Sequence, residues 1–226
     1  MITEEIHRIT EQLPEGVRLV AVSKFHPSAA IREAFAAGQT LFGESHAQEL
    51  QRKHEELADL PDLEWHFIGH LQTNKVKYIA PYVALIHAVD TPHLLAEIDK
   101  QGQKCGRTIP CLLQLHVAQE ESKFGFTPDE ALAFFDEGAW QQLAHVQLAG
   151  VMAMASHTDD NVRVRDDFRR ARRFFEQAQS FFPAAEGGRS PFAELSMGMS
   201  EDWHIAIDEG ATLIRIGTQI FGERQY

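Results

Sequence analysis

One lysine stands where an amine could react covalently with a carbonyl group. Lys24 follows the apolar run LVAVS and precedes Phe25-His26-Pro27. Partial burial lowers the pKa of a lysine amine, and the unprotonated amine forms Schiff bases with aldehydes and ketones. A solvated lysine at the start of a loop is the alternative interpretation. The position of Lys24 in the sequence leaves both interpretations open.

Two glycine-containing segments near the end of the chain are suited to hold a phosphate. In SMGMSED, Gly198 would let backbone N–H groups approach an anion, and Ser200 fits the N-cap of the helix predicted to follow. In RIGTQIFGE, Gly217 and Thr218 offer further N–H groups and a hydroxyl. Ser200 as a plain helix cap is the alternative, and the two roles are compatible because a capped helix still presents other N–H groups.

Arg215 lies inside the apolar segment LIRIG, which predicts a largely buried strand. A buried guanidinium is unfavourable unless it has a specific partner. The partner could be an acid of a neighbouring strand, such as Glu44, or it could be a bound cofactor. The sequence favours neither partner over the other.

These residues belong to a regular alternation of strands and helices. Apolar runs typical of buried parallel strands begin near Arg18, Thr40, Glu64, Leu85, Ile109, Val146, Phe192 and Leu213. Most are separated by about one helix and two short loops. Eight successive strand–helix units with no clear crossover break predict an α/β fold, a single (β/α)8 barrel of the TIM type, whose typical length is about 250 residues. An open doubly wound sheet is the alternative.

Helix boundaries are marked by capping residues. An N-cap, a first-turn proline and a capping-box glutamate occur in order at 127–130, and this helix is predicted to end at Gly138. Another helix opens at Thr91-Pro92 and is predicted to end near Gly102. The remaining predictions are a leading helix over 2–13, an amphipathic helix over 161–182, and helix ends at Gly38 and Gly210.

In (β/α)8 barrels, functional side chains lie at the carboxyl ends of the strands. This rule selects a set of candidates beyond those already named. The full set comprises Lys24, Glu44, Ser45, His66, the segment 69–72, Met152, Ser156, the segment 196–200, Arg215, Gly217 and Thr218.

The charge balance excludes some classes of partner. The 226 residues include 21 Lys and Arg against 33 Asp and Glu, a formal net charge of −12. This balance argues against general nucleic-acid binding and against attraction to anionic membranes. The arginines between 163 and 173 alternate with acids, which favours a solvated, ion-paired helix face.

The sequence also predicts that the protein is cytoplasmic. No stretch approaches the ~20 apolar residues of a membrane span, and the acidic start has no signal-peptide pattern. Two cysteines, Cys105 and Cys111, are too few for a disulfide framework and fit a reducing compartment. His66 and His70 are four residues apart at a strand end, without the helical spacing of a metal motif, so we expect no metal site.

Six motifs give the chain a resemblance to a known family. VAVSK, FGES followed by AQE, WHFIGHLQTNK, GVMAM, ELSMGMSEDWHIAI and IRIGTQIFGER resemble, in this order, the pyridoxal-phosphate homeostasis family, also called the YggS type or the proline-synthetase-co-transcribed type. The resemblance extends from about Val20 to Arg224. It implies one barrel domain over 1–226, similar to the N-terminal domain of alanine racemase, the type III pyridoxal-phosphate fold.

The resemblance also implies a role for each candidate. Lys24 would carry pyridoxal 5'-phosphate (PLP) as a Schiff base, and Arg215 would contact the pyridine nitrogen. Ser196, Gly198, Ser200, Gly217 and Thr218 match the phosphate-binding segments, and Ser45, His66 and Met152 match the ring pocket. The chain departs from the family at Ser45-His46, where asparagine and tyrosine are usual, which puts a ring contact there in doubt. Lys123 would have a peripheral role.

The resemblance implies a PLP carrier or regulator in vitamin B6 and amino-acid homeostasis, with no catalytic residues. An arginine cannot accept a proton, so it would leave the pyridine nitrogen neutral and the ring a poor electron sink. No second domain with a tyrosine base is expected. The expected partners are PLP and PLP-dependent apoenzymes, and the expected state is a monomer. Two alternatives stay open: a PLP-dependent racemase or lyase, and a sugar-phosphate enzyme that uses Lys24 like a class I aldolase.

Overall fold

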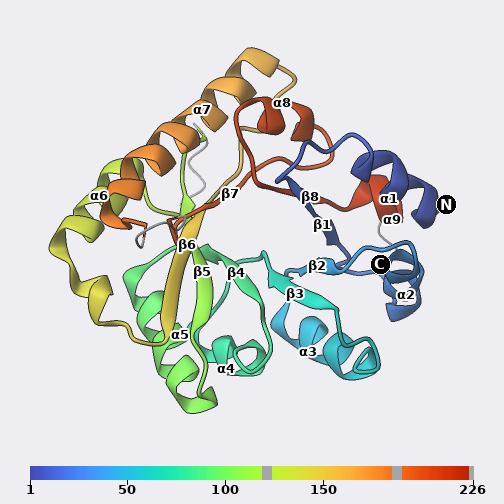
Figure 1. The fold of residues 1–226 in the computed structure, drawn as a ribbon, viewed down its shortest axis with the longest axis horizontal. Coiled ribbons are helices and arrows are strands. Elements are labelled where there is room, and N and C mark those ends of the chain that lie inside the picture. The colour runs from blue at the N-terminus through green and yellow to red at the C-terminus, as the bar shows by residue number, and fades with distance from the viewer. Residues whose placement is uncertain (119–123, 185–189, 224–226) are drawn as a thin grey trace.

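Eight parallel strands close into a barrel in the computed structural model, which describes residues 1–118, 124–184 and 190–223. Each strand pairs with the next, and β8 closes the ring on β1 in the register Arg18 to Leu213. Figure 1 shows the strands around the centre with the helices outside them. The strands are β1 (Arg18–Val22), β2 (Leu41–Glu44), β3 (Glu64–Phe67), β4 (Leu85–Val89), β5 (Ile109–Leu115), β6 (Val146–Ala153), β7 (Glu194–Ser196) and β8 (Leu213–Ile216).

Helices follow the strands around the ring, and one helix precedes the first strand. They are α1 (Ile2–Thr10), α2 (Ser28–Ala36), α3 (Ala47–Glu56), α4 (Val76–Ile79), α5 (Pro92–Cys105), α6 (Pro128–Glu137), α7 (Asn161–Ala178), α8 (Trp203–Asp208) and α9 (Thr218–Phe221). Short 3-10 turns occur at Thr73–Lys75, Ala139–Gln142 and Gln179–Phe181. The first helix packs against α2 and α9, so it covers the place where the ring closes (Figure 1).

The predicted barrel is confirmed, and most of its strands begin within a residue of the predicted starts. The exception is β7, which begins at Glu194 rather than near Phe192. Phe192 instead belongs to the loop before β7, where its buried ring stacks on Phe182 with 4.5 Å between ring centroids. Its apolar character therefore reflects packing against the helix layer and not membership of a strand.

Capping residues fix several helix ends as predicted. Thr127 and Glu130 form the capping box of α6, and Gly138 ends that helix with a left-handed φ of 70°. The prediction for α5 is wrong at its end, because the helix continues to Cys105 and its left-handed cap is Gly106, with φ of 65°. Gly102 instead packs tightly inside the helix, where a Cβ would lie 2.9 Å from the Arg107 carbonyl oxygen.

Two long helices are shorter than predicted. The leading helix ends at Thr10, where the side-chain hydroxyl donates to the Ile6 carbonyl at 2.7 Å, and residues up to 13 form a turn. The helix predicted over 161–182 ends as an α-helix at Ala178 and tightens into a 3-10 turn. Gly38 and Gly210 follow the ends of α2 and α8, as predicted, with φ of 92° at both.

The apolar core has two parts. The larger part lies between the strands and the helices, where each buried aliphatic or aromatic side chain contributes about 1.5–3 kcal/mol. The smaller part fills the inside of the barrel and consists of Val20, Leu85, Ala88, Leu112, Ala149, Met152 and Leu213. Met152 therefore packs inside the barrel, and its side chain is 2% exposed.

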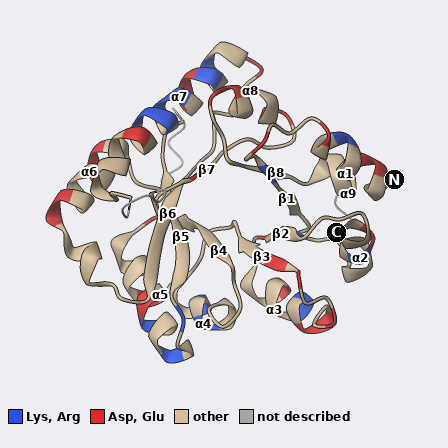
Figure 2. Cartoon of the chain, in the orientation of Figure 1, with Lys and Arg blue, Asp and Glu red and all other residues tan. Residues whose placement is uncertain are grey.

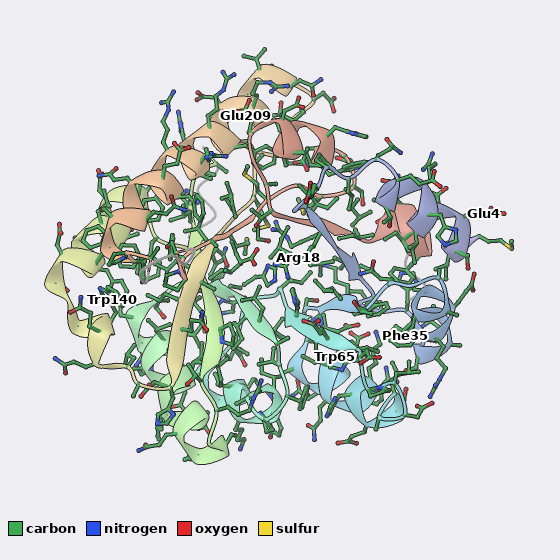
Figure 3. All side chains as sticks on the ribbon, viewed as in Figure 1. Glu4, Arg18, Phe35, Trp65, Trp140 and Glu209 are labelled. Atoms are coloured by element: carbon green, nitrogen blue, oxygen red, sulfur yellow. The ribbon has the colours of Figure 1, made fainter. Side chains whose placement is uncertain are left out.

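Charged residues are concentrated on the helices (Figure 2). Four arginines of α7, at positions 165, 169, 170 and 172, form ion pairs with acids on α7 and in the Asp208-Glu209 segment, which confirms the predicted ion-paired face. Figure 3 places Arg18 near the centre of the ring, where it pairs with Glu194 of β7. In the described part of the chain, no helix is both long and apolar enough to cross a membrane.

Candidate functional site

A cavity of about 570 Å³ opens among the segments that follow the carboxyl ends of β1, β6, β7 and β8. This is the end of the barrel at which the strand-order rule places functional residues. The lining residues are Val22, Lys24, His26, Ile68, Ala155, Ser156, His157, Thr158, Asp159, Asn161, Val164, Met199, Ser200, Glu201, Asp202, Arg215, Gly217 and Thr218.

The cavity brings together five of the ten residues to which the resemblance assigns a cofactor contact. Lys24, Ser200, Arg215, Gly217 and Thr218 line it, although they come from three separate segments of the chain. The candidate Ser156 also lines the cavity, whereas the other five of the ten do not: Ser45, His66, Met152, Ser196 and Gly198. For Met152 the reason is the barrel core described above, and for Ser45 the hydroxyl lies 3.2 Å from the His46 ring. Their direct contact with a cofactor stays a prediction.

Lys24 occupies a tight turn at the end of β1. The His26 N–H donates to the Ser23 carbonyl at 3.1 Å, which closes the turn around Lys24 and Phe25. Phe25 has a φ of 66°, the one positive φ of a non-glycine residue in the described ranges. Side chains rarely adopt this conformation, so the surrounding structure must hold it in place.

Arg215 extends from β8 into the cavity wall and is 4% exposed. Its Nη1 donates to Ser196 Oγ at 2.6 Å, and its Nη2 donates to the Ala153 carbonyl at 3.1 Å. Burial lowers the pKa of Arg215 to about 10, and the nearby Asp202 opposes that change. Arg215 therefore remains a cation at neutral pH and can only donate hydrogen bonds.

The suggested pairing of Arg215 with Glu44 is wrong. Glu44 is fully buried and its Oε1 lies 2.7 Å from the Lys53 ammonium of α3. Ser23 Oγ also donates to Glu44 Oε1 at 2.7 Å. Burial raises the pKa of Glu44, whereas the Lys53 charge acts in the opposite direction. Arg215 instead finds its partners on β7, which pairs with β8, and on β6, the next strand along the ring.

A chain of buried polar side chains continues from Arg215 across the barrel. Ser196 Oγ lies 2.9 Å from His87 Nδ1, and His87 Nε2 lies 2.9 Å from His66 Nδ1. Burial lowers the pKa of His66 to about 3 and lowers that of His87 well below its ordinary value. Both imidazoles are therefore neutral at pH 7, and the predicted site residues Ser196 and His66 lie in the interior, bonded to Arg215 and to His87.

The predicted cap of α8 is wrong. The N-cap is Asp202, whose Oδ1 accepts from the Met199 N–H at 2.6 Å, and Ser200 lies in the turn before it. Gly198 is required by packing, because at its φ of 94° a Cβ would lie 2.6 Å from the Ala206 Cβ of α8. Burial raises the pKa of Asp202, which lines the same cavity.

The second predicted phosphate segment forms the start of α9. Gly217 is the N-cap of that helix, and Thr218 is its first residue. A Cβ on Gly217 would lie 3.1 Å from the Val22 carbonyl oxygen, so a larger residue would press on β1 just before Lys24. This segment and Lys24 are thus neighbours in the folded chain, as the closure of β8 on β1 requires.

Several cavity residues were not singled out from the sequence. His26, His157, Thr158, Asp159 and Glu201 line the cavity, and all lie in the segments after β1, β6 and β7. Including the whole loop after each strand would have found them. His87 was also missed, although a histidine inside the apolar run LIHAV (85–89) indicates a buried imidazole with a partner. Lys123 lies outside the described residues.

The two histidines considered for a metal point to different partners. His66 contacts His87 inside the barrel, whereas His70 Nδ1 lies 2.9 Å from Asp90 Oδ2. In residues 1–118, 124–184 and 190–223, no group of three or more His, Cys, Asp or Glu side chains could hold a metal ion. Cys105 is exposed and Cys111 is buried, and both are free thiols.

Comparison with known proteins agrees with this geometry. The family described as "Alanine racemase, N-terminal domain" matches residues 1–225. Alanine racemase from E. faecalis has the same fold, with a TM-score of 0.69 at 20% identity over 98% of this chain and 57% of that chain. The barrel with a lysine after its first strand is therefore a barrel of the alanine racemase N-terminal type.

Closer relatives narrow the family. The pyridoxal phosphate homeostasis protein of Aquifex aeolicus is 39% identical over 100% of this chain and 96% of its own length. That of Pseudomonas aeruginosa is 39% identical over 94% and 87%. PipY of Synechococcus elongatus, solved both without PLP and with PLP bound, has a TM-score of 0.88 and 40% identity over 98% of this chain and 100% of its own. The chain belongs to the pyridoxal phosphate homeostasis protein family.

Proposed function

We propose that this protein binds pyridoxal 5'-phosphate in the cavity at the carboxyl end of the barrel, as a Schiff base on Lys24. The observation that carries the proposal is that Lys24, Arg215, Gly217 and Thr218 line one cavity. Its volume of about 570 Å³ falls in the range of roughly 300–1,000 Å³ typical of small-molecule sites. The related PipY with PLP bound supports the same assignment.

The donor set fits the three functional groups of this cofactor. Lys24 supplies the amine that an aldehyde requires, and the bond would form with loss of one water molecule. Gly217 and Thr218 begin α9, so backbone N–H groups and a hydroxyl are available for a phosphate. Ser200 supplies a second hydroxyl from the segment after the neighbouring strand, β7. Arg215 is the candidate for contact with the pyridine nitrogen.

Arg215 also supports a role without efficient turnover. The cofactor, when bound, acts as an electron sink, and a protonated pyridine nitrogen strengthens that action. Arg215 keeps its proton at neutral pH because its pKa is about 10, so it would donate to the nitrogen and leave it neutral. Arg215 is itself held by Ser196 and the Ala153 carbonyl, which fixes this donor geometry.

The proposed role is therefore that of a non-catalytic PLP carrier or regulator in vitamin B6 and amino-acid homeostasis. The names of the relatives in Aquifex aeolicus and Pseudomonas aeruginosa support this role. We propose that the protein is a cytoplasmic monomer and that PLP-dependent apoenzymes are its partners. The net charge of −12 is unfavourable for nucleic acids and anionic membranes as partners.

A second candidate function, a PLP-dependent racemase or lyase, is favoured by one observation. His26, His157 and Asp159 line the same cavity as Lys24. An imidazole or a carboxylate at this position could act as a general acid or base. The two functions differ in their rate of exchange at the α-carbon of amino acids, which is the subject of a prediction below.

The test of the proposed function is a covalent label. Purified protein is incubated with PLP, reduced with borohydride and digested, and the pyridoxyl group is located by mass spectrometry. We expect the group on Lys24, and we expect Lys24→Ala to lose both the label and the visible absorbance. Lys100→Ala, at an exposed lysine of α5, is the matched control. A label found mainly on another lysine, such as Lys75, would contradict the proposal.

A further inference from the structure

Lys53 is a fully buried lysine that the proposed cofactor site does not use. It lies on α3, and its side chain is 0% exposed. Its ammonium lies 2.8 Å from the Ser23 carbonyl oxygen, 2.7 Å from Glu44 Oε1 and 2.8 Å from Glu49 Oε1. An ammonium has three protons to donate, so these three acceptors satisfy it.

Two of these contacts reach the peptide groups on either side of Lys24. The Ser23 carbonyl, which precedes Lys24, accepts from Lys53 directly. The Phe25 N–H, which follows Lys24, donates to Glu49 Oε1 at 2.7 Å, and Glu49 is itself paired with Lys53. A single pair of side chains, one turn apart on α3, therefore holds the backbone both before and after Lys24.

The turn at Lys24 and Phe25 has an unusual backbone conformation, so it requires stabilising contacts. Phe25 has a φ of 66° at the turn position that glycine usually occupies. A phenylalanine there would favour other conformations in the absence of an external contact. The Glu49 carboxylate accepts the Phe25 N–H in this conformation, so the hydrogen bond stabilises the unusual turn at the residue next to Lys24.

Glu44 connects this group to the barrel. It lies at the end of β2, and its Oε1 accepts from both Lys53 and the Ser23 hydroxyl. In the described part of the chain, Glu44 Oε2 has no hydrogen-bond partner. A buried carboxylate with one unpaired oxygen is costly, so the Lys53 charge is required to keep it in place.

We propose that Lys53, Glu49 and Glu44 form a clamp that holds the Lys24 turn in its binding conformation before any ligand arrives. All three are positioning residues: Lys53 and Glu49 bond to the backbone on either side of Lys24, and Glu44 holds the Lys53 ammonium and the Ser23 hydroxyl. Lys53 itself is not a competing nucleophile, since it is buried and its donors are occupied. The effect of the clamp on cofactor loading rests on the proposed function, whereas its effect on the turn does not.

The first arm of the test uses the protein without cofactor. Amide hydrogen exchange at Phe25 is followed by NMR in the wild type, Glu49→Ala, Glu49→Gln and Glu55→Ala. We expect exchange at least about tenfold faster in Glu49→Ala, because the Phe25 N–H loses a hydrogen bond to a charged acceptor. Glu49→Gln keeps an oxygen that accepts from the same donors and should stay near the wild type. Glu55, which is exposed on the same helix, is the control.

The second arm measures PLP itself. The affinity for PLP and the rate of Lys24 labelling after borohydride are compared in the same four proteins. A turn that is only partly in its binding conformation lowers the apparent affinity by the fraction that is competent. We therefore expect Glu49→Ala to weaken PLP binding by the reciprocal of its competent fraction without moving the label, and Glu49→Gln to restore binding.

The outcomes separate the two ideas. If the wild type carries no label on Lys24, the proposed function fails, and the exchange arm still tests the clamp. If Glu49→Ala keeps wild-type exchange at Phe25 and wild-type affinity for PLP, the clamp is wrong. The clamp is also wrong if Glu49→Gln or Glu55→Ala loses as much protection at the Phe25 amide and as much affinity for PLP as Glu49→Ala. Lys53→Met provides an independent variant, expected to speed exchange at Phe25 in the folded protein.

Discussion

Arg215 Nη1 donates to Ser196 Oγ at 2.6 Å, and both side chains are buried. The Ser196 hydroxyl then needs an acceptor for its own proton, because an undonated buried hydroxyl is unfavourable. His87 Nδ1, at 2.9 Å, is that acceptor. His87 must in turn carry its proton on Nε2, and it donates from there to His66 Nδ1 at 2.9 Å. The charge on Arg215 thus sets the donor-to-acceptor direction of every hydrogen bond from Ser196 to His66.

This direction predicts the tautomers of two histidines. His87 and His66 should both be neutral with the proton on Nε2 at pH 7. Two-bond 15N–1H NMR spectra distinguish the two tautomers of a neutral imidazole. Ser196→Ala should remove the acceptor requirement at His87 and release its tautomer, whereas Ser200→Ala should leave it unchanged. A proton on Nδ1 of His87 in the wild type would show that Ser196 accepts from both neighbours.

The buried histidines should make stability depend on pH. His66 has a pKa of about 3 in the folded protein against an ordinary value of 6.5, because burial disfavours its charged form. The unfolded chain therefore binds a proton below about pH 6.5 that the folded chain does not bind. The contribution of His66 to stability is fully present above pH 6.5 and is lost progressively as the pH falls towards about 3. His87 acts in the same direction.

The measurement is the free energy of unfolding by urea between pH 7.5 and about pH 4.5. His66→Asn keeps an oxygen acceptor for His87 and removes the titrating ring, so its stability should fall less steeply with decreasing pH. His7→Asn, at an exposed position on α1, should keep the wild-type slope. Glu44 and Asp202 have raised pKa values and act in the opposite direction at the acid end. Equal slopes in the wild type and His66→Asn would contradict the prediction.

Gly198 and Gly106 form a matched pair for testing why glycine is needed. Both have a positive φ, but a Cβ on Gly198 would meet the Ala206 Cβ at 2.6 Å, whereas a Cβ on Gly106 would meet nothing within 4 Å. Gly106→Ala should cost about 1–2 kcal/mol for the left-handed conformation. Gly198→Ala should cost about 1–3 kcal/mol more, since α8 must also move. Equal losses of unfolding free energy in the two variants, measured with urea, would show that α8 can move away from the added Cβ without destabilising the protein.

Ser200 should matter for the ligand and not for the fold. It lines the cavity but does not cap α8, because Asp202 is the N-cap. Ser200→Ala should therefore change the free energy of unfolding by less than about 0.5 kcal/mol. The same variant should weaken PLP modestly and leave pyridoxal, which has no phosphate, almost unaffected. If Ser200→Ala lowers the free energy of unfolding but leaves the ratio of the affinities for PLP and pyridoxal unchanged, the role of Ser200 is structural.

The absence of efficient turnover is tested by exchange at the α-carbon. The loaded protein is incubated with L-alanine and other amino acids in deuterium oxide, and exchange and racemisation are followed together. Because Arg215 is expected to leave the ring nitrogen neutral, we predict rates well below the ~1–1000 per second of ordinary enzymes. Turnover in that range, abolished by His157→Ala, would establish the second candidate function.

The sequence by itself determined the barrel and the position of its reactive end. Strand starts followed from apolar runs, and the boundaries of α6 followed from Thr127 and Gly138, because caps and periodicity depend on residues a few positions apart. Lys24, Arg215, Gly217 and Thr218 could be placed in one site because parallel strands bring their carboxyl ends together. The resemblance of the motifs then predicted which cofactor this site binds.

Only the tertiary structure decided which buried polar groups are partners. His87 and Ser196 are 109 residues apart in sequence, and Lys53 and Ser23 are 30 apart. Neither pairing leaves a local pattern, because each depends on where ring closure and helix packing bring two side chains. The pairing of Glu44 also depends on packing. Glu44 pairs with Lys53 and not with Arg215 because α3 brings Lys53 next to the end of β2. Sequence periodicity indicates which side chains are buried, and three-dimensional packing determines which of them bond to each other.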